Sequence, residues 1–159
     1  MVKRILGAIA VAAMMIAGIQ AATADSCNFA SPDDARLLAL RASAHLDGVG
    51  PEQAFRDFMD PAAKFVDRDL YVFVLDLNGV LWASGAFPNQ IGAEALDAQD
   101  ASGRFFVEDM VRIAKDEGEG WVEYEMLHPC TGDLSPKVSF VKRVGGFIVG
   151  VGAYGTMSA

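Results

Sequence analysis

Residues 70–83 read LYVFVLDLNGVLWA and carry the clearest structural signal in the chain. The first six residues, LYVFVL, have the β-branched and aromatic composition of a buried strand. The pair Asn78-Gly79 is the strongest short signal for a hairpin turn. Residues 80–83, VLWA, return as a second apolar run. The stretch therefore predicts an antiparallel β-hairpin in the middle of the chain.

Two helices are predicted before this hairpin. The first begins at Ser31-Pro32-Asp33-Asp34, where serine can cap free N–H groups, proline suits the first helical position and the acids oppose the positive end of the helix dipole. Leucine and alanine recur at helical spacing over residues 37–44. Gly48 and Gly50 end this helix, and Pro51 begins a second, shorter one.

A loop, a helix and three strands are predicted after the hairpin. The loop runs from Gly85 to Gly92, and the helix follows Asp100-Ala101-Ser102-Gly103, where Asp100 or Ser102 is expected to cap it. The three strands cover residues 120–126, 138–144 and 147–154. Short turns join them, which favours antiparallel neighbours. The fold class is therefore α+β, with helices packed on one antiparallel sheet.

The first 24 residues have the order of a secretory signal peptide. Lys3 and Arg4 precede an apolar run at 5–19, and Ala22-Thr23-Ala24 is a small-x-small cleavage site. We expect cleavage before Asp25, which leaves residues 25–159 as a single domain outside the cytoplasm, periplasmic if the cell has a periplasm. The alternative is a retained membrane anchor, although the run is shorter than the ~20 apolar residues that a spanning helix needs.

The charge of the chain excludes some partners. The formal net charge is −8, and loss of Lys3 and Arg4 with the signal would make it −10. Phosphate backbones and anionic membrane surfaces repel such a domain. We therefore expect no nucleic-acid partner.

The chain has two cysteines, Cys27 and Cys130, and no C-x-x-C motif. Two thiols in an oxidising compartment most often pair, so a disulfide between them is expected. The alternative is two free thiols.

Enzyme and metal motifs are absent from the sequence. His45 and His128 have no metal-ligand spacing, and no G-x-S-x-G or phosphate-binding glycine loop occurs. A nucleophile–base pair of Cys130 and His128 is conceivable, but pairing of Cys130 with Cys27 is the better interpretation. We expect no enzyme activity, no cofactor and no metal.

A series of short motifs covers most of the chain after the signal. They are YVFVLD (71–76), NGVL (78–81), IG (91–92), DASG (100–103), GWVEY (120–124), Pro129 with Gly132, PKVSFVKR (136–143) and GVGAY (150–154). In their order and spacing, from residue 33 to 154, the chain resembles the single Cache domains of the second type. The resemblance implies a PAS-like five-stranded antiparallel sheet behind a long N-terminal helix, and an extracytoplasmic pocket for small molecules, often organic acids.

The chain departs from the usual plan of this family in two places. Such domains usually belong to chemoreceptors or histidine kinases, but the sequence ends at Ala159, so we expect neither a second membrane span nor an output domain. Many members also carry His-Pro after the second strand, where this chain has Ser84-Gly85-Ala86-Phe87-Pro88.

Four residues are the candidates for ligand binding. Lys137 leads into an apolar strand, and the resemblance places a ligand-facing lysine there; the alternative is a solvated lysine at a strand end. Tyr71, Trp82 and Tyr124 lie on three different strands and suit pocket walls, although core packing is an equal alternative. The three phenylalanines Phe73, Phe87 and Phe106 are expected in the core.

Taken together, these features predict an exported, free-standing Cache-like domain that binds a small organic ligand, such as a short carboxylic acid. It would serve extracytoplasmic sensing and signal transduction alongside a separate membrane receptor or kinase. One alternative is a ligand-free interaction or structural module. The other is a membrane-anchored sensor fragment with its signal uncleaved.

Overall fold

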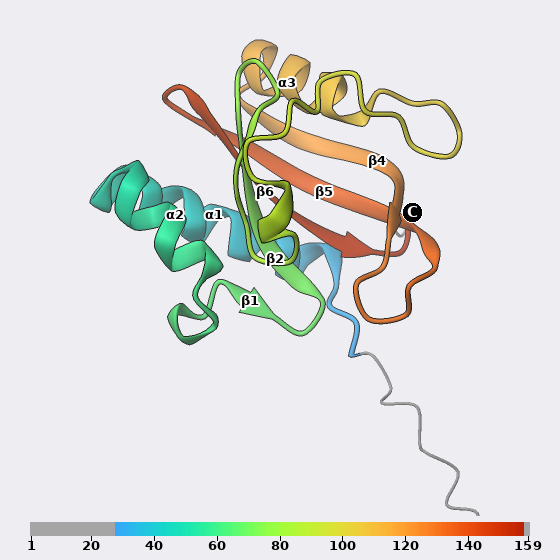
Figure 1. Ribbon diagram of the computed structural model, residues 1–159, viewed down its shortest axis with the longest axis horizontal. Helices are drawn as coiled ribbons and strands as arrows, with labels where there is room; N and C mark the ends of the chain where they lie inside the picture. Colours follow the sequence, from blue (N-terminus) through green and yellow to red (C-terminus); the bar gives the residue numbers. More distant parts are fainter. Residues whose placement is uncertain (1–27, 158–159) are drawn as a thin grey trace, which may run out of the picture.

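The computed structural model describes residues 28–157, and Figure 1 shows the arrangement of their elements. The predicted signal peptide, residues 1–24, and Cys27 lie outside the described residues. Within the described part, three α-helices pack on one antiparallel sheet, which confirms the predicted α+β class. The helices are α1 (Pro32–Val49), α2 (Pro51–Met59) and α3 (Phe106–Asp116). None of the described helices combines the length and apolarity that a membrane span requires.

Helix α1 begins where its capping residues predict. The Ser31 hydroxyl accepts a hydrogen bond from the backbone N–H of Asp34 at 3.1 Å, and the Asp34 carboxylate accepts one from the N–H of Ser31 at 3.1 Å. Gly50 ends the helix at a φ of 81°, a conformation that glycine adopts without steric cost. Its N–H donates to the carbonyl of Leu46, and Pro51 then starts α2.

The sheet has six strands rather than the five expected. They are β1 (Val66–Asp67), β2 (Leu70–Asp76), β3 (Leu81–Ser84), β4 (Glu119–Leu127), β5 (Leu134–Val144) and β6 (Phe147–Tyr154). The order is β1-β2-β6-β5-β4, and β3 also pairs with β2. The additional strand is β1, which has only two residues and therefore no alternation that a sequence pattern could reveal.

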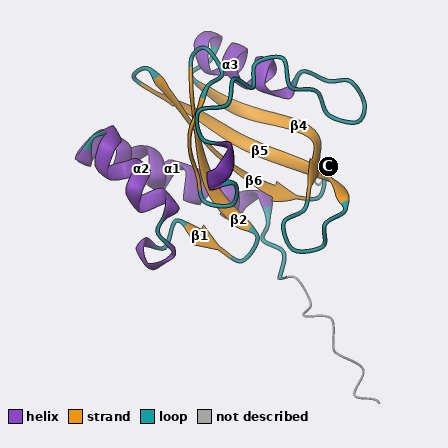
Figure 2. Cartoon of the chain, in the orientation of Figure 1, coloured by secondary structure: helices purple, strands orange, loops and turns teal. Residues whose placement is uncertain are grey.

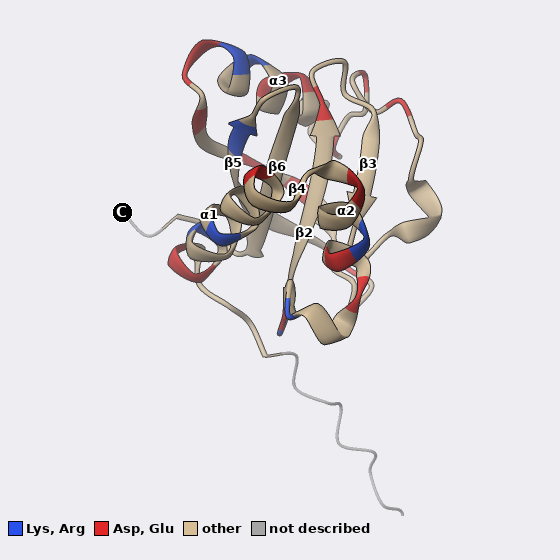
Figure 3. Cartoon of the chain, turned by 90° about the vertical axis from the view of Figure 1, so that its left-hand side faces the viewer, with Lys and Arg blue, Asp and Glu red and all other residues tan. Residues whose placement is uncertain are grey.

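The two faces of the sheet have different neighbours. Val72 of β2 and Val151 of β6 pack in one apolar cluster with α1 and α2. Tyr71 and Ile148, on the opposite face, belong to a second cluster with α3. Figure 2 shows the long loop between β3 and α3, with its short helical turn, lying in front of the sheet. Figure 3 shows that charged residues lie mainly on the helices and turns, so the central strands are largely apolar.

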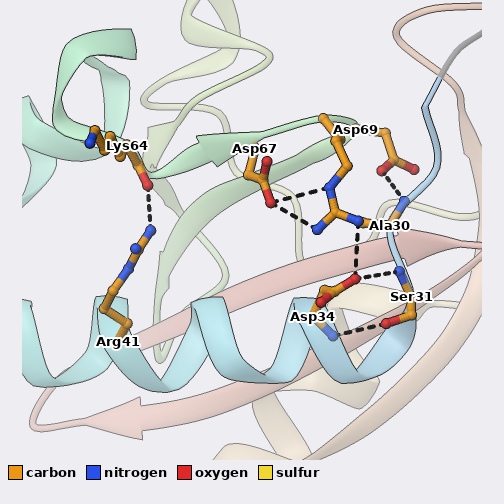
Figure 4. A network of polar contacts seen from close by, with 8 residues as sticks. Ala30, Ser31, Asp34, Arg41, Lys64, Asp67 and Asp69 are labelled. Atoms are coloured by element: carbon orange, nitrogen blue, oxygen red, sulfur yellow. Dashed lines mark hydrogen bonds and ion pairs between the residues drawn. The ribbon is translucent and has the colours of Figure 1, made fainter.

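A polar network ties the start of α1 to the turn between β1 and β2 (Figure 4). Arg68 forms ion pairs with Asp34 at 3.1 Å and Asp67 at 2.8 Å. Beside them, the backbone N–H of Ala30 donates to Oδ1 of Asp69 at 2.7 Å. Exposed ion pairs of this kind add ~0–1 kcal/mol each, and the Asp69 side chain is held separately, by the N–H of Ala30.

Candidate functional site

A cavity of about 150 Å³ lies between the sheet and the loop that leads to α3. Tyr71 of β2 and Tyr124 of β4 line it from the sheet. Phe73, Phe87 and Phe106 belong to the second apolar cluster or pack against it, as expected, and they also line this cavity. A volume near 150 Å³ suits a molecule of a few heavy atoms, since a water molecule takes about 30 Å³ in the liquid.

Lys137 of β5 is buried against Tyr71, one of the residues that line this cavity, although Lys137 itself does not line it. Its side chain is among the largest fully buried ones, with 1% of the residue exposed, so the alternative of a solvated lysine is wrong. Its Nζ atom donates a hydrogen bond to the Tyr71 hydroxyl at 2.7 Å. The same nitrogen lies 4.1 Å from the ring centre of Tyr71 and 4.6 Å from that of Tyr154. The cation is therefore held between two aromatic rings with one hydrogen bond of its own.

The surroundings of Lys137 lower the pKa of its amino group. Burial lowers the pKa of Lys137 from 10.5 to about 7, and the carboxylate of Asp69 partly opposes this shift. Burial also raises the pKa of Tyr71 well above 10 and that of Tyr154 to about 12. An anion placed near Nζ would favour the charged form of the lysine.

Tyr124 connects the cavity to an outer hollow. Its ring stacks on Phe106 at 4.5 Å between ring centres, and its hydroxyl shares a 2.9 Å hydrogen bond with Ser139. Tyr124 and Lys137 also line a hollow of about 350 Å³ at the ends of β4 and β5. Lys137, Tyr71 and Tyr124 thus lie close together in the fold, and their role in ligand binding stays a prediction.

Trp82 does not join the other three candidates. Its ring packs against Phe55 of α2 and Phe147 of β6, at 6.4 and 6.1 Å, and 45% of the residue is exposed. It does not line the cavity. The pairing of β2 with β3 shifts register between Val74 and Leu75, which places an extra residue at Trp82. This bulge turns the indole toward α2, which corrects its expected place in the pocket wall.

Asp100 organises the loop over the cavity rather than capping a helix. Its Oδ1 atom accepts hydrogen bonds from the N–H and hydroxyl of Ser102 and from the N–H of Arg104. These bonds lower the pKa of Asp100 to about 2. Its Oδ2 accepts from the N–H of Glu125 on β4 at 3.2 Å. Neither Asp100 nor Ser102 caps α3, whose N-cap residue is Phe105.

Asp69 and His128 are two polar residues of the site that sequence reasoning did not select. Their side chains are 3% and 1% exposed, and Oδ2 of Asp69 lies 4.0 Å from Nε2 of His128. His128 stands opposite Gly85 and Ala86, in the segment that departs from the family pattern. The two residues are far apart in the chain, so only the folded sheet brings them together.

Residues 28–157 contain no group of three His, Cys, Asp or Glu side chains that could hold a metal ion. Nδ1 of His128 accepts hydrogen bonds from the N–H groups of Cys130 and Thr131, so this nitrogen serves the turn and not a thiol. What the described residues bring together is an apolar cavity with aromatic walls and, against one of these walls, a buried lysine.

Comparison with known proteins places this arrangement in a family. The model of the family "Single Cache domain 2" matches residues 10–156. A methyl-accepting chemotaxis protein from Vibrio parahaemolyticus superimposes with a TM-score of 0.66 at 15% identity, over 77% of this chain and 86% of that one. The periplasmic sensor domain of a chemotaxis protein gives a TM-score of 0.59 at 25% identity, over 78% and 90%.

A third solved structure is a Cache chemosensory domain studied for its carboxylic acid recognition. It superimposes with a TM-score of 0.66 at 21% identity, over 78% of this chain and 92% of that one. The three likenesses agree with the antiparallel sheet and its helices found here. Because the family model spans nearly the whole sequence, the chain belongs to the single Cache domain 2 family of sensor domains.

Proposed function

We propose that this domain is an exported sensor module that binds a short carboxylic acid in the cavity beside Lys137. The observation that carries the proposal is the buried lysine nitrogen, 2.7 Å from the Tyr71 hydroxyl and bracketed by two tyrosine rings. A charge-assisted hydrogen bond in such a place contributes ~1.5–3 kcal/mol. The small apolar cavity suits the hydrocarbon part of the acid.

Two further observations support the wider role. One solved relative recognises carboxylic acids and another is a periplasmic sensor domain of a chemotaxis protein. The export pattern of residues 3–24 agrees with an extracytoplasmic place of action. We propose that a membrane receptor or kinase reads the ligand-bound state.

A thermal-shift screen of short carboxylic acids tests the proposal. A ligand at a hundred times its Kd stabilises the folded protein by ~2.7 kcal/mol, which gives a clear shift in Tm. Lys137→Met should weaken the binding of any acid found by about ten- to a hundredfold. Trp82→Phe is the control, because Trp82 lies on β3, packs against Phe55 and Phe147, and lines neither the cavity nor the surroundings of Lys137.

Two results would contradict this function. If no acid in a broad panel shifts the Tm of the wild type, a ligand-free interaction module becomes the better interpretation. If an acid binds wild type and Lys137→Met equally well, the lysine is not its partner. Native mass spectrometry of the protein purified from cells would identify any metabolite that stays bound.

A further inference from the structure

Asp69 and His128 face each other with two unsatisfied polar atoms. Oδ2 of Asp69 and Nε2 of His128 are 4.0 Å apart, and neither has a hydrogen-bond partner among residues 28–157. Both side chains are at least 97% buried, with 3% and 1% exposed. Buried polar side-chain atoms in folded proteins nearly always have a partner. Two unsatisfied atoms that point at one gap therefore indicate a place for a polar group.

The neighbouring hydrogen bonds indicate that Nε2 of His128 is a donor and Oδ2 of Asp69 an acceptor. Nδ1 of His128 accepts from the backbone N–H groups of Cys130 at 3.1 Å and Thr131 at 3.3 Å. The proton of the neutral ring is then on Nε2, which becomes a donor. Oδ1 of Asp69 already accepts from Ala30, while Oδ2 is a spare acceptor. A separation of 4.0 Å is too long for a direct hydrogen bond between them.

Asp69 and His128 also help to line a small cavity, although Oδ2 and Nε2 themselves are buried. Asp69, His128, Tyr71, Gly85 and Ala86 are among the residues that line a space of about 120 Å³. Tyr71 lines this space and also the larger cavity of about 150 Å³. The ring of Tyr154 lies 4.1 Å from the ring of His128 and 4.6 Å from Nζ of Lys137. Tyr154 thus contacts both Lys137 and His128, and Tyr71, which contacts Lys137, lines both cavities.

The chemistry of the gap selects one kind of group. A carboxylate would meet repulsion from Asp69, and an ammonium would face the N–H of His128. A hydroxyl oxygen can accept from Nε2–H and donate to Oδ2 at once. We propose that Asp69 and His128 form a hydroxyl-binding subsite, which makes the domain prefer a short hydroxy acid to the same acid without the hydroxyl. This inference rests on the proposed function for the carboxylate half of the ligand.

Two substitutions remove the subsite while keeping the local structure. In His128→Asn the amide oxygen can replace Nδ1 as acceptor for the turn, but nothing replaces Nε2–H. In Asp69→Asn the oxygen can still accept from Ala30, while an NH₂ donor replaces the spare acceptor. Because Asp69 also acts on the charge of Lys137, the comparison is the ratio of two affinities within each variant.

The experiment is calorimetric titration of matched acids: propionate against lactate, and butyrate against β-hydroxybutyrate. In the wild type, one hydroxy acid should bind at least about tenfold more tightly than its partner. Both variants should lose this preference and still bind the unsubstituted acid. Addition of the hydroxy acid to the wild-type protein should also shift the Nε2–H resonance of His128 in NMR spectra. Addition of the unsubstituted acid should leave this resonance unchanged.

The outcomes separate the two proposals. If the wild type binds the acids but shows no preference for a hydroxyl, the subsite holds bound water only and this inference is overturned, while the proposed function stands. If the variants keep the preference, Asp69 and His128 do not read the hydroxyl, and the inference is again overturned. If none of the four acids binds the wild type, both the inference and the carboxylate function fail together.

Discussion

The side chain of Lys137 lies directly over Gly152 of the neighbouring strand. A Cβ atom built on Gly152 would be 2.2 Å from Cε of Lys137 and 2.3 Å from the hydroxyl of Ser139. The absence of a side chain at this point of β6 lets the lysine cross the strand and reach Tyr71 of β2. Gly152 is therefore part of the site although it has no polar side chain.

Gly152→Ala should displace Lys137 and weaken acid binding by about tenfold or more, because the new methyl group occupies the path of the lysine chain. Crowding in the core should also destabilise the fold by ~1–3 kcal/mol. Gly146→Ala is the control, since a Cβ atom there meets nothing within 4 Å. Calorimetric titration and denaturant unfolding measure both effects. Unchanged binding in Gly152→Ala would show that the lysine has another route to the ligand.

Lys137→Met should raise the free energy of unfolding of the ligand-free protein above that of the wild type, and the increase should be largest at acidic to neutral pH. The pKa of Lys137 is about 7 in the fold and 10.5 when unperturbed, so between these values the unfolded chain binds more protons than the folded one. The stability of the wild type should therefore rise with pH from about 7 to about 10.5, and its burial cost should be greatest below pH 7. Methionine removes that cost, on the order of a few kcal/mol.

Urea unfolding at several pH values checks this expectation for Lys137. Lys142→Met, on the same strand but with 35% of the side chain exposed, is the control and should keep the pH profile of the wild type. A solvated lysine at a strand end would give no such effect, but Lys137 is 1% exposed. Parallel pH profiles for wild type and Lys137→Met would show that the lysine keeps its proton in the fold.

Binding of a carboxylate at alkaline pH should take up a proton. Above pH 7 the lysine is largely neutral, and the arriving anion restores its charge, so affinity should fall as the pH rises from about 7 toward 10. Tyr71 and Tyr154 do not titrate in this range, since burial raises the pKa of both, to about 12 for Tyr154. Titration calorimetry in two buffers of different ionisation enthalpy counts the protons. No uptake at pH 8.5 would contradict direct contact with Lys137.

Cys27 and Cys130 should form a disulfide in the exported protein. The ring of Phe29 lies 5.1 Å from that of His128, so the segment that follows Cys27 contacts the turn that carries Cys130. Cross-linking Cys27 and Cys130 closes a loop of about 100 residues, which could stabilise the fold by up to ~4–5 kcal/mol. Peptide mapping without reductant should find the linked pair, and reduction should lower the Tm. Alkylation of both thiols in the unreduced, unfolded protein would end the hypothesis.

The sequence was sufficient for the long elements of this fold. The hairpin of β2 and β3, the capped start of α1 and the last three strands all lie where their patterns place them. Strand β1 was missed because two residues show no period. Lys137 was selected as a ligand candidate, but its burial was not within reach, because the alternation of Val138 and Phe140 with Lys137 and Ser139 is typical of a strand whose polar face is exposed.

Two features of the site depend on structure that no local pattern reveals. The bulge at Trp82 reverses the face of one residue, and alternation alone places that residue on the wrong side. Asp69 and His128 precede β2 and follow the end of β4, and each reads as an ordinary polar residue at a strand end. They meet because β4 and β2 both lie beside the β5–β6 pair in the folded sheet.

The bulge at Trp82 also has an optical consequence. The chain contains two tryptophans, and both lie on the face of the sheet that α1 and α2 cover. Trp82 packs beside Phe55 of α2, and Trp121 packs beside Phe140 against the cluster of α1. A ligand in the cavity can touch neither indole directly. Any change in intrinsic fluorescence on ligand addition would therefore report a rearrangement carried through the sheet to the helices, so the protein contains its own probe of signal transmission.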